Sequence, residues 1–126
     1  MSTTTDRALS DQIKDVIENA PVAVFMKGTP QRVMCGNSDR ALRALAASGG
    51  APIATVDVLP DPQIRQELSA LSGWPTIPQV FVKGELIGGA DICEALAASG
   101  ELRRKLDEAL GVEREQTVKT VALSGA

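Results

Sequence analysis

Cys35 is the residue whose type and position are best suited to chemistry. It follows a polar loop, residues 28–34, and precedes a run with helical character, residues 39–47. We therefore expect the sulfur at or just before a helix N-terminus, where unpaired amide N–H groups and the helix dipole favour negative charge. A thiol in that position has a lowered pKa and is partly thiolate, the form that attacks disulfides and binds metals. Taken by itself, the stretch also fits an inert buried cysteine.

Ser38 stands where a second cysteine would complete a Cys-x-x-Cys pair. A hydroxyl cannot resolve a mixed disulfide, so a one-thiol site is expected. The chain has no histidine, which excludes Cys/His and Ser/His catalysis and zinc sites with an imidazole ligand. Its only other cysteine is Cys93, so the chain cannot supply four thiolates. A soft-metal site on Cys35 must therefore take ligands from another molecule.

Composition excludes several further classes of function. The chain has 126 residues and a formal charge of −3, with no basic stripe, which argues against nonspecific binding of nucleic acid. No apolar run approaches the length of a membrane span, so no membrane partner is expected. Acidic residues at positions 6, 11, 15 and 18 exclude a secretory signal and fit a transit peptide poorly. The expected location is the cytoplasm, where free thiols persist.

The elements that must position Cys35 alternate between helix and strand. Helices are expected over residues 7–18, 37–48, 92–98 and 101–110, with another opened by Asp61-Pro62 and ended by Gly73; strands are expected over residues 22–26, 53–58, 79–82 and 86–88. Two strands joined through a helix should be parallel, and the hairpin at Lys83-Gly84-Glu85 adds two antiparallel strands. We therefore predict one α/β domain, residues 7–111, with a four-stranded mixed sheet flanked by helices on both faces. Residues 1–6 are expected to be a polar lead and residues 112–126 a loosely held polar tail.

Five short motifs, in order and at matching separations, resemble those of the monothiol glutaredoxins that carry a Cys-Gly-Phe-Ser site. They are Phe25-Met26-Lys27-Gly28-Thr29-Pro30, Cys35-Gly36-x-Ser38, Ile64-Arg65, Trp74-Pro75-Thr76-Ile77-Pro78 and Gly88-Gly89-x-Asp91-Ile92. The resemblance covers about residues 10–110 and implies the thioredoxin fold. It also implies that the chain binds glutathione, a peptide thiol with two carboxylates and one amine.

The resemblance assigns the glycine end of glutathione to Lys27 and Arg65, which would hold its carboxylate. For both residues the alternative is an ordinary solvated charge, which for Arg65 would lie on a helix. The resemblance also implies a cis-proline loop at Thr76-Ile77-Pro78, in which the backbone of Ile77 pairs with the cysteinyl unit like an added strand. The alternative is that Pro78 merely begins a strand.

The resemblance places the γ-glutamyl end at Gly89, Ala90 and Asp91. The glycine lets the backbone approach the ligand closely, and the amides of Ala90 and Asp91 lie at a helix start, where they would accept the carboxylate. The carboxylate of Asp91 would pair with the ammonium group of the ligand. A plain helix N-cap is the alternative for Asp91.

Two residues depart from the family pattern or have no match in it. Asn37 stands where the family has Phe, which removes an apolar cover beside the sulfur. We expect a metal cluster here to be more exposed to water and shorter-lived than in relatives with Phe. Cys93 has apolar neighbours and is expected to be a small buried residue, with a regulatory disulfide to Cys35 as the alternative. Some relatives have their second cysteine at the position of Ala90, so no role is carried over to Cys93.

Three functions fit this pattern. The first is an iron–sulfur carrier: a [2Fe–2S] cluster needs four thiolates, which Cys35 from each of two protomers and two glutathiones would supply. The resemblance then implies a homodimer when cluster-bound, a monomer when apo, and BolA-type proteins and iron–sulfur apoproteins as partners. The second is a glutathione-dependent thiol–disulfide oxidoreductase with Cys35 as its sole nucleophile. The third is a redox-inactive adaptor. The missing second thiol and the long loop over residues 31–34, which resembles that of the cluster-binding class, favour the carrier over the enzyme.

Overall fold

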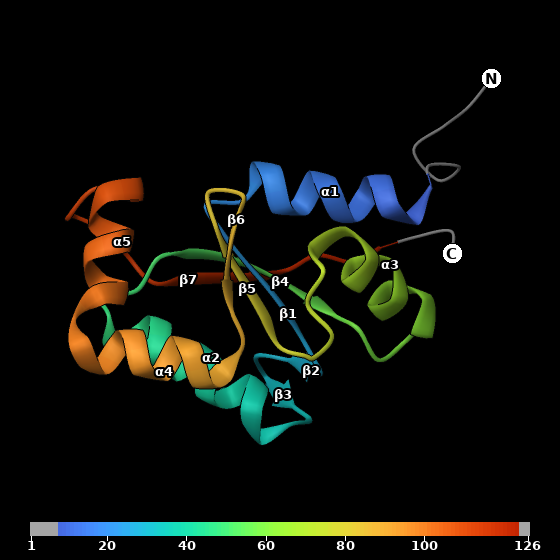
Figure 1. Cartoon of the computed structure of the whole chain (residues 1–126), viewed down its shortest axis with the longest axis horizontal. Helices are drawn as coiled ribbons and strands as arrows, with labels where there is room; N and C mark the ends of the chain where they lie inside the picture. The colour runs from blue at the N-terminus through green and yellow to red at the C-terminus, as the bar shows by residue number, and fades with distance from the viewer. Residues whose placement is uncertain (1–7, 124–126) are drawn as a thin grey trace.

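Two groups of helices enclose a central mixed sheet in the computed structural model, which describes residues 8–123 (Figure 1). The elements in chain order are α1 (Leu9–Asn19), β1 (Val22–Met26), β2 (Gly28–Thr29), β3 (Arg32–Val33), α2 (Gly36–Ala47), β4 (Pro52–Asp57), α3 (Pro62–Ser72), β5 (Gln79–Val82), β6 (Glu85–Gly88), α4 (Ala90–Ser99), α5 (Glu101–Leu110) and β7 (Thr117–Thr120). The fold class is thus confirmed as a mixed α/β sheet flanked by helices on both faces. The polar lead predicted for residues 1–6 lies outside the described residues. No helix within residues 8–123 is long and apolar enough to span a membrane.

Strand β1 is the centre of the sheet, whose order is β6-β5-β1-β4-β7. It pairs in parallel with β4 and antiparallel with β5, and β5 pairs antiparallel with β6. Because β5 runs opposite to β1, the end of β1 lies beside the start of β5, with Phe25 opposite Gln79. The loops after β1 and β4 and the loop before β5 therefore meet at one edge of the sheet.

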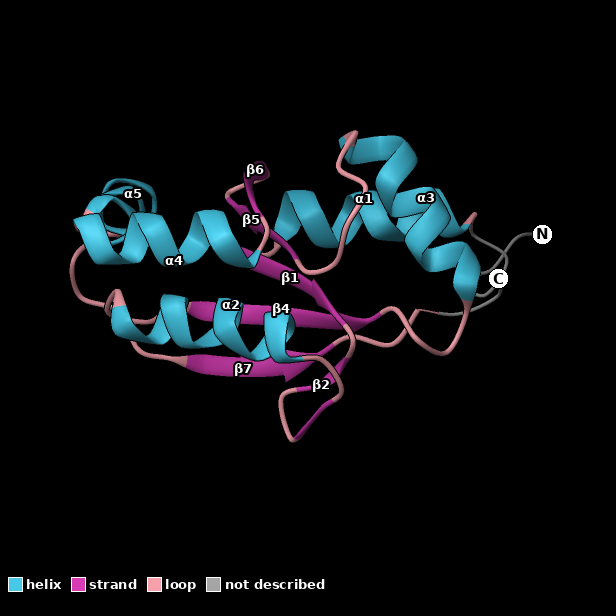
Figure 2. Ribbon diagram, turned by 60° about the horizontal axis from the view of Figure 1, so that its bottom comes forward, coloured by secondary structure: helices cyan, strands magenta, loops and turns pink. Residues whose placement is uncertain are grey.

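Side-chain alternation along β1 divides the core into two parts. Val22, Val24 and Met26 pack with buried residues of α2, α4 and α5, whereas Ala23 and Phe25 pack with buried residues of α1 and α3. All five side chains of β1 are buried, which explains why this strand reads as an uninterrupted apolar run. Figure 2 shows the same division, with α2, α4 and α5 in one group and α1 and α3 in another.

The sheet has five strands, so the prediction of four was wrong. The fifth strand, β7, pairs in parallel with β4 and comes from residues that we expected to be a loosely held tail. No apolar alternation marks β7, and all four of its residues are exposed. Its approach is fixed instead by the buried guanidinium of Arg114, which donates to the carbonyls of Ser48 and Gly50 at 2.8 Å each. The division of the chain at residue 112 stays a prediction.

Local signals placed most of the element boundaries well. The carboxylate of Asp61 accepts a hydrogen bond of 2.9 Å from the N–H of Gln63, so it caps α3 as expected. The hairpin turn has Lys83 and Gly84 at positive φ, 50° and 84°. Helix α4 begins at Ala90, two residues earlier than predicted. The two-residue strands β2 and β3, which form a small hairpin before Cys35, were not predicted.

Candidate functional site

Cys35 is the N-cap residue of α2, which confirms the predicted position of its sulfur. The residue has an extended backbone, is partly exposed to solvent and forms no disulfide. The backbone N–H of Ser38 contributes most to lowering the pKa of the Cys35 thiol. The N–H of Asn37, the positive charge of Lys27 and the hydroxyl of Ser38 lower it further, and partial burial opposes them. The site therefore holds an accessible thiol with an increased thiolate population.

The side chain of Ser38 joins the thiol to the end of β1. It is fully buried, and its hydroxyl accepts a hydrogen bond of 3.1 Å from the backbone N–H of Lys27. Because the same hydroxyl helps to lower the pKa of Cys35, its proton is available to the sulfur while its lone pair is held by Lys27. Ser38 thus fixes the start of α2 against β1.

A cavity of about 260 Å³ brings together six of the predicted glutathione-binding residues. They are Thr76, Ile77, Pro78, Gly89, Ala90 and Asp91. The peptide bond between Ile77 and Pro78 is cis, as predicted. A Cβ added at Gly89 would lie 3.3 Å from the carbonyl oxygen of Pro78, so a side chain at Gly89 would crowd the wall of this cavity. Asn37, Arg40, Trp74 and Ile92 complete the lining.

The other two predicted residues, Lys27 and Arg65, border a second cavity of about 480 Å³. This cavity lies at the same edge of the sheet, between the loop after β4 and helix α3. Arg65 Nη2 lies 3.4 Å from the carbonyl oxygen of Pro75, which links α3 to the loop that lines the first cavity. Cys35 lines neither cavity. However, Asn37, two residues further on, lines the first, and Lys27, whose charge acts on the thiol, lines the second.

Gln79, a residue that the sequence did not mark as functional, stabilises the loop before Pro78. Its side chain is fully buried, and its amide nitrogen donates to the carbonyls of Trp74 and Thr76 at 2.8 and 3.3 Å. A buried amide at the first position of an apolar strand is the signal that would have found it, because such a group needs hydrogen-bond partners.

Arg40 is the second residue that the sequence did not reveal. Its guanidinium pairs with Asp91 across 2.7 Å, so the carboxylate predicted to hold the ammonium of glutathione already has a cationic partner. Arg40 and Asp91 are 51 positions apart, and a long-range pair of exposed charges leaves no pattern in a single sequence. Arg40 also contacts Asn37 and Glu94.

Cys93 is fully buried in the core between the sheet and helices α2, α4 and α5. Burial raises the pKa of its thiol to about 11, and the residue forms no disulfide. These observations favour the small buried residue over the regulatory disulfide. Within residues 8–123, no group of three or more metal-ligating side chains comes together. Cys35 is therefore the one accessible thiolate in the described part of the chain.

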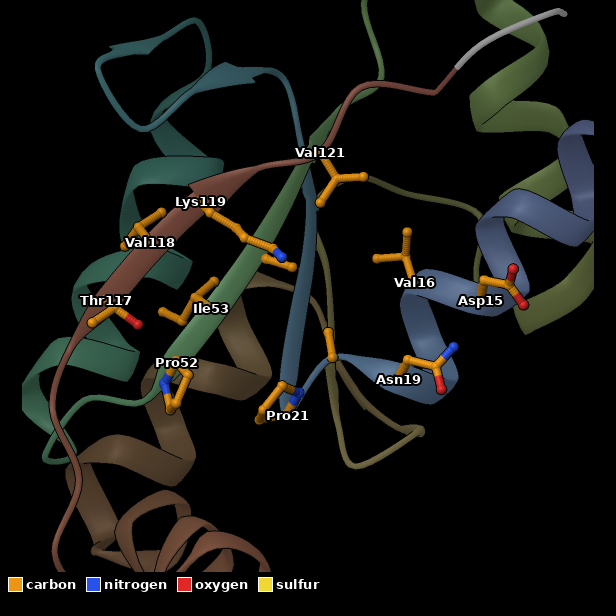
Figure 3. A pocket seen from close by; sticks show the side chains of 12 residues that line it. Asp15, Val16, Asn19, Pro21, Pro52, Ile53, Thr117, Val118, Lys119 and Val121 are labelled. Atoms are coloured by element: carbon orange, nitrogen blue, oxygen red, sulfur yellow. The ribbon is translucent and has the colours of Figure 1, made fainter. Parts of the chain in front are cut away.

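A larger cavity is lined by neither cysteine. It has a volume of about 570 Å³ and lies between α1 and the β4–β7 side of the sheet. Figure 3 shows Val16 of α1 facing Ile53 of β4 and Val121, which follows β7. Its walls are mainly apolar, and they carry no thiol, so size alone does not mark the reactive site of this fold.

Known proteins resemble this chain in both sequence and fold. The glutaredoxin family model matches residues 22–87. Monothiol glutaredoxin-S11 of Oryza sativa subsp. japonica is 46% identical over 101 residues, which are 80% of this chain but only 20% of that protein. The mitochondrial monothiol glutaredoxin-5 of Saccharomyces cerevisiae is 44% identical over 110 residues, 86% of this chain and 73% of that protein. The solution structure of reduced poplar apo GrxS14 superposes with a TM-score of 0.72 at 36% identity and covers 82% of this chain and 94% of that chain. This chain therefore belongs to the glutaredoxin family, as a monothiol glutaredoxin with the thioredoxin fold.

Proposed function

We propose that this chain binds glutathione and carries a [2Fe–2S] cluster, shared between two protomers, to iron–sulfur apoproteins. The observation that supports this most directly is the single accessible thiol with a lowered pKa beside two cavities lined by the residues expected to bind glutathione. A cluster needs four thiolates and each protomer offers one, so glutathione would supply the two remaining thiolate ligands.

The donor set of the site fits a shared cluster and does not fit a cluster held by one chain. Ser38 replaces the second thiol, and Cys93 is fully buried with a raised pKa, so neither can be a second thiolate ligand. Two protomers, each with Cys35 and one glutathione, provide the four sulfur ligands. The cluster itself would be the cargo, and its release to an apoprotein would return two monomers.

The residues of the chain would bind glutathione as an extended peptide along one edge of the sheet. Lys27 and Arg65 supply positive charge for the glycine carboxylate. Ile77, before the cis-proline, would pair its backbone with the cysteinyl unit, which directs that sulfur toward Cys35. The N-terminus of α4 at Ala90 and Asp91 favours the γ-glutamyl carboxylate.

Reconstitution with iron, sulfide and glutathione tests this proposal. We expect a brown dimer by visible absorbance and size-exclusion chromatography, formed only when both Cys35 and glutathione are present. Cys35→Ser should abolish the colour, whereas Cys93→Ala should retain it, because Cys93 is buried and is not a ligand. A coloured dimer without glutathione, or from the Cys35→Ser protein, would contradict the ligand set.

A glutathione-dependent oxidoreductase is the second candidate, favoured by the lowered pKa of Cys35. The Cys35 thiolate would attack the glutathione sulfur of a protein–glutathione mixed disulfide, forming a Cys35–glutathione disulfide and releasing the protein as a thiolate. A second glutathione thiolate would then attack that disulfide, giving oxidised glutathione and free Cys35. A colourless monomer that reduces a mixed disulfide would favour this function. Unchanged behaviour of Cys35→Ser in both assays would favour a redox-inactive adaptor.

The partners follow from the carrier proposal. We propose BolA-type proteins and iron–sulfur apoproteins as binding partners of the cluster-bound dimer. Pull-down with and without reconstituted cluster would test whether such proteins recognise the loaded form. The cytoplasmic location expected from the sequence stays a prediction.

A further inference from the structure

Arg40 lies at the wall of the 260 Å³ cavity and connects its two sides. From α2, its Nε donates to Glu94 Oε2 at 2.8 Å, its Nη1 to Asn37 Oδ1 at 2.8 Å, and its Nη2 to Asp91 Oδ1 at 2.7 Å. Nη2 also contacts Glu94 Oε1. One guanidinium therefore joins the segment just after Cys35 to the first turns of α4.

The pairing leaves groups of both signs available at the cavity. A guanidinium has five N–H groups, and the four contacts with residues of the described chain leave one N–H on Nη1. Asp91 uses one carboxylate oxygen for Arg40, and its side chain is 91% exposed, so its other oxygen can accept a further donor. A cationic donor and an anionic acceptor therefore lie side by side at one end of the cavity.

Asn37 holds Arg40 in this position. Its side-chain oxygen accepts from Nη1, a contact that the Phe of the family pattern could not make. Arg43 is one turn further along the same helix and pairs with Asp39 instead, with its side chain 80% exposed. It does not line the cavity.

Resting on the glutathione binding proposed above, we propose that Arg40 is a specificity-determining residue of this cavity. It donates to the α-carboxylate of a γ-glutamyl group whose ammonium binds Asp91. The pocket thereby selects the zwitterionic end of the peptide over analogues that lack either charge. Without Arg40 the two carboxylates of Asp91 and Glu94 would attract the ammonium but repel the carboxylate beside it.

Binding of three peptides under reducing conditions tests the assignment, followed by calorimetry or by the fluorescence of Trp74, which lines the cavity. The peptides are glutathione, 4-aminobutyryl-Cys-Gly, which lacks the α-carboxylate, and glutaryl-Cys-Gly, which lacks the ammonium. Arg40→Gln should lower the preference for glutathione over the decarboxylated peptide by about tenfold, the scale of a charge-assisted hydrogen bond. It should keep or increase the preference for glutathione over the peptide without the ammonium, because Asp91 loses its competing cation. Arg43→Gln should leave both preferences unchanged.

The outcomes separate this inference from the function on which it rests. If the wild-type protein binds none of the peptides, the proposed glutathione binding fails, and this inference fails with it. If the wild type binds glutathione but Arg40→Gln keeps the wild-type preference, Arg40 is not a specificity residue. An equal change for all three peptides, weaker or tighter, also overturns the inference, because Arg40 would then only join α2 to α4 or compete for Asp91.

Discussion

Replacing Ser38 by Ala should both weaken the fold and make Cys35 less acidic. The substitution removes a buried acceptor from the N–H of Lys27, which lies 3.1 Å away. Leaving such a donor unsatisfied costs about 1–3 kcal/mol. The higher helix propensity of alanine offsets about 0.5 kcal/mol of this cost. We therefore expect the free energy of unfolding to fall by about 0.5–2.5 kcal/mol, measured by urea denaturation under reducing conditions.

The same substitution acts on the thiol through a second contact. The Ser38 hydroxyl is one of the groups that lower the pKa of Cys35, so its removal should raise that pKa. The backbone N–H of Ser38, the largest contribution, remains, and the thiol should stay more acidic than an ordinary cysteine. The rate of alkylation by iodoacetamide measured against pH should shift to higher pH. Cys93 is fully buried and should not contribute to the rate.

Ser48→Ala is the matched control, at the other end of the same helix. Ser48 is buried as well, but its hydroxyl has no hydrogen-bond partner among the described residues. Its removal should not lower stability, because it deletes a buried hydroxyl that has no hydrogen-bond partner among the described residues, and it should leave the alkylation profile unchanged. If Ser38→Ala behaves like this control in both assays, the Ser38 hydroxyl does not couple β1 to the thiol.

Three further substitutions test other parts of the structure. Arg114→Met should lower the free energy of unfolding, measured by urea denaturation, by about 2–4 kcal/mol. The substitution leaves Asp107 and several backbone carbonyls without their hydrogen-bond donor. An unchanged stability would mean that Arg114 does not anchor β7. Burial raises the pKa of Cys93 to about 11. As pH rises, the Cys93 thiol therefore loses its proton at a lower pH in the unfolded chain than in the folded protein. Stability should therefore fall as pH rises from about 9 toward 11, and Cys93→Ala should reduce that slope; a slope that persists would assign it to other groups. Asn37→Phe should lengthen the lifetime of a reconstituted cluster, followed by the decay of its visible absorbance, since an apolar ring would exclude water; an equal lifetime would contradict the predicted effect of Asn37.

Most of the fold followed from local signals in the chain. The buried run of β1, the Asp61 cap of α3 and the hairpin at Lys83-Gly84 all depend on residues close in sequence, where patterns are strong. β7 could not be predicted in this way. Its side chains are exposed and bury little apolar surface, and it is placed by the hydrogen bonds of Arg114 to residues more than 60 positions away.

By itself, the sequence determined that the chain has one reactive thiol at a helix start, no second thiol beside it, and the motifs of the glutaredoxins. These properties depend on residue type and on short spacings. Only the tertiary structure decided that the predicted glutathione-binding residues border two cavities, that Ser38 couples β1 to Cys35, and that Arg40 forms an ion pair with Asp91. Each of these depends on contacts between segments far apart in the chain, which are set by strand register and by the packing of α2 against α4. Such contacts leave no periodic pattern along the chain.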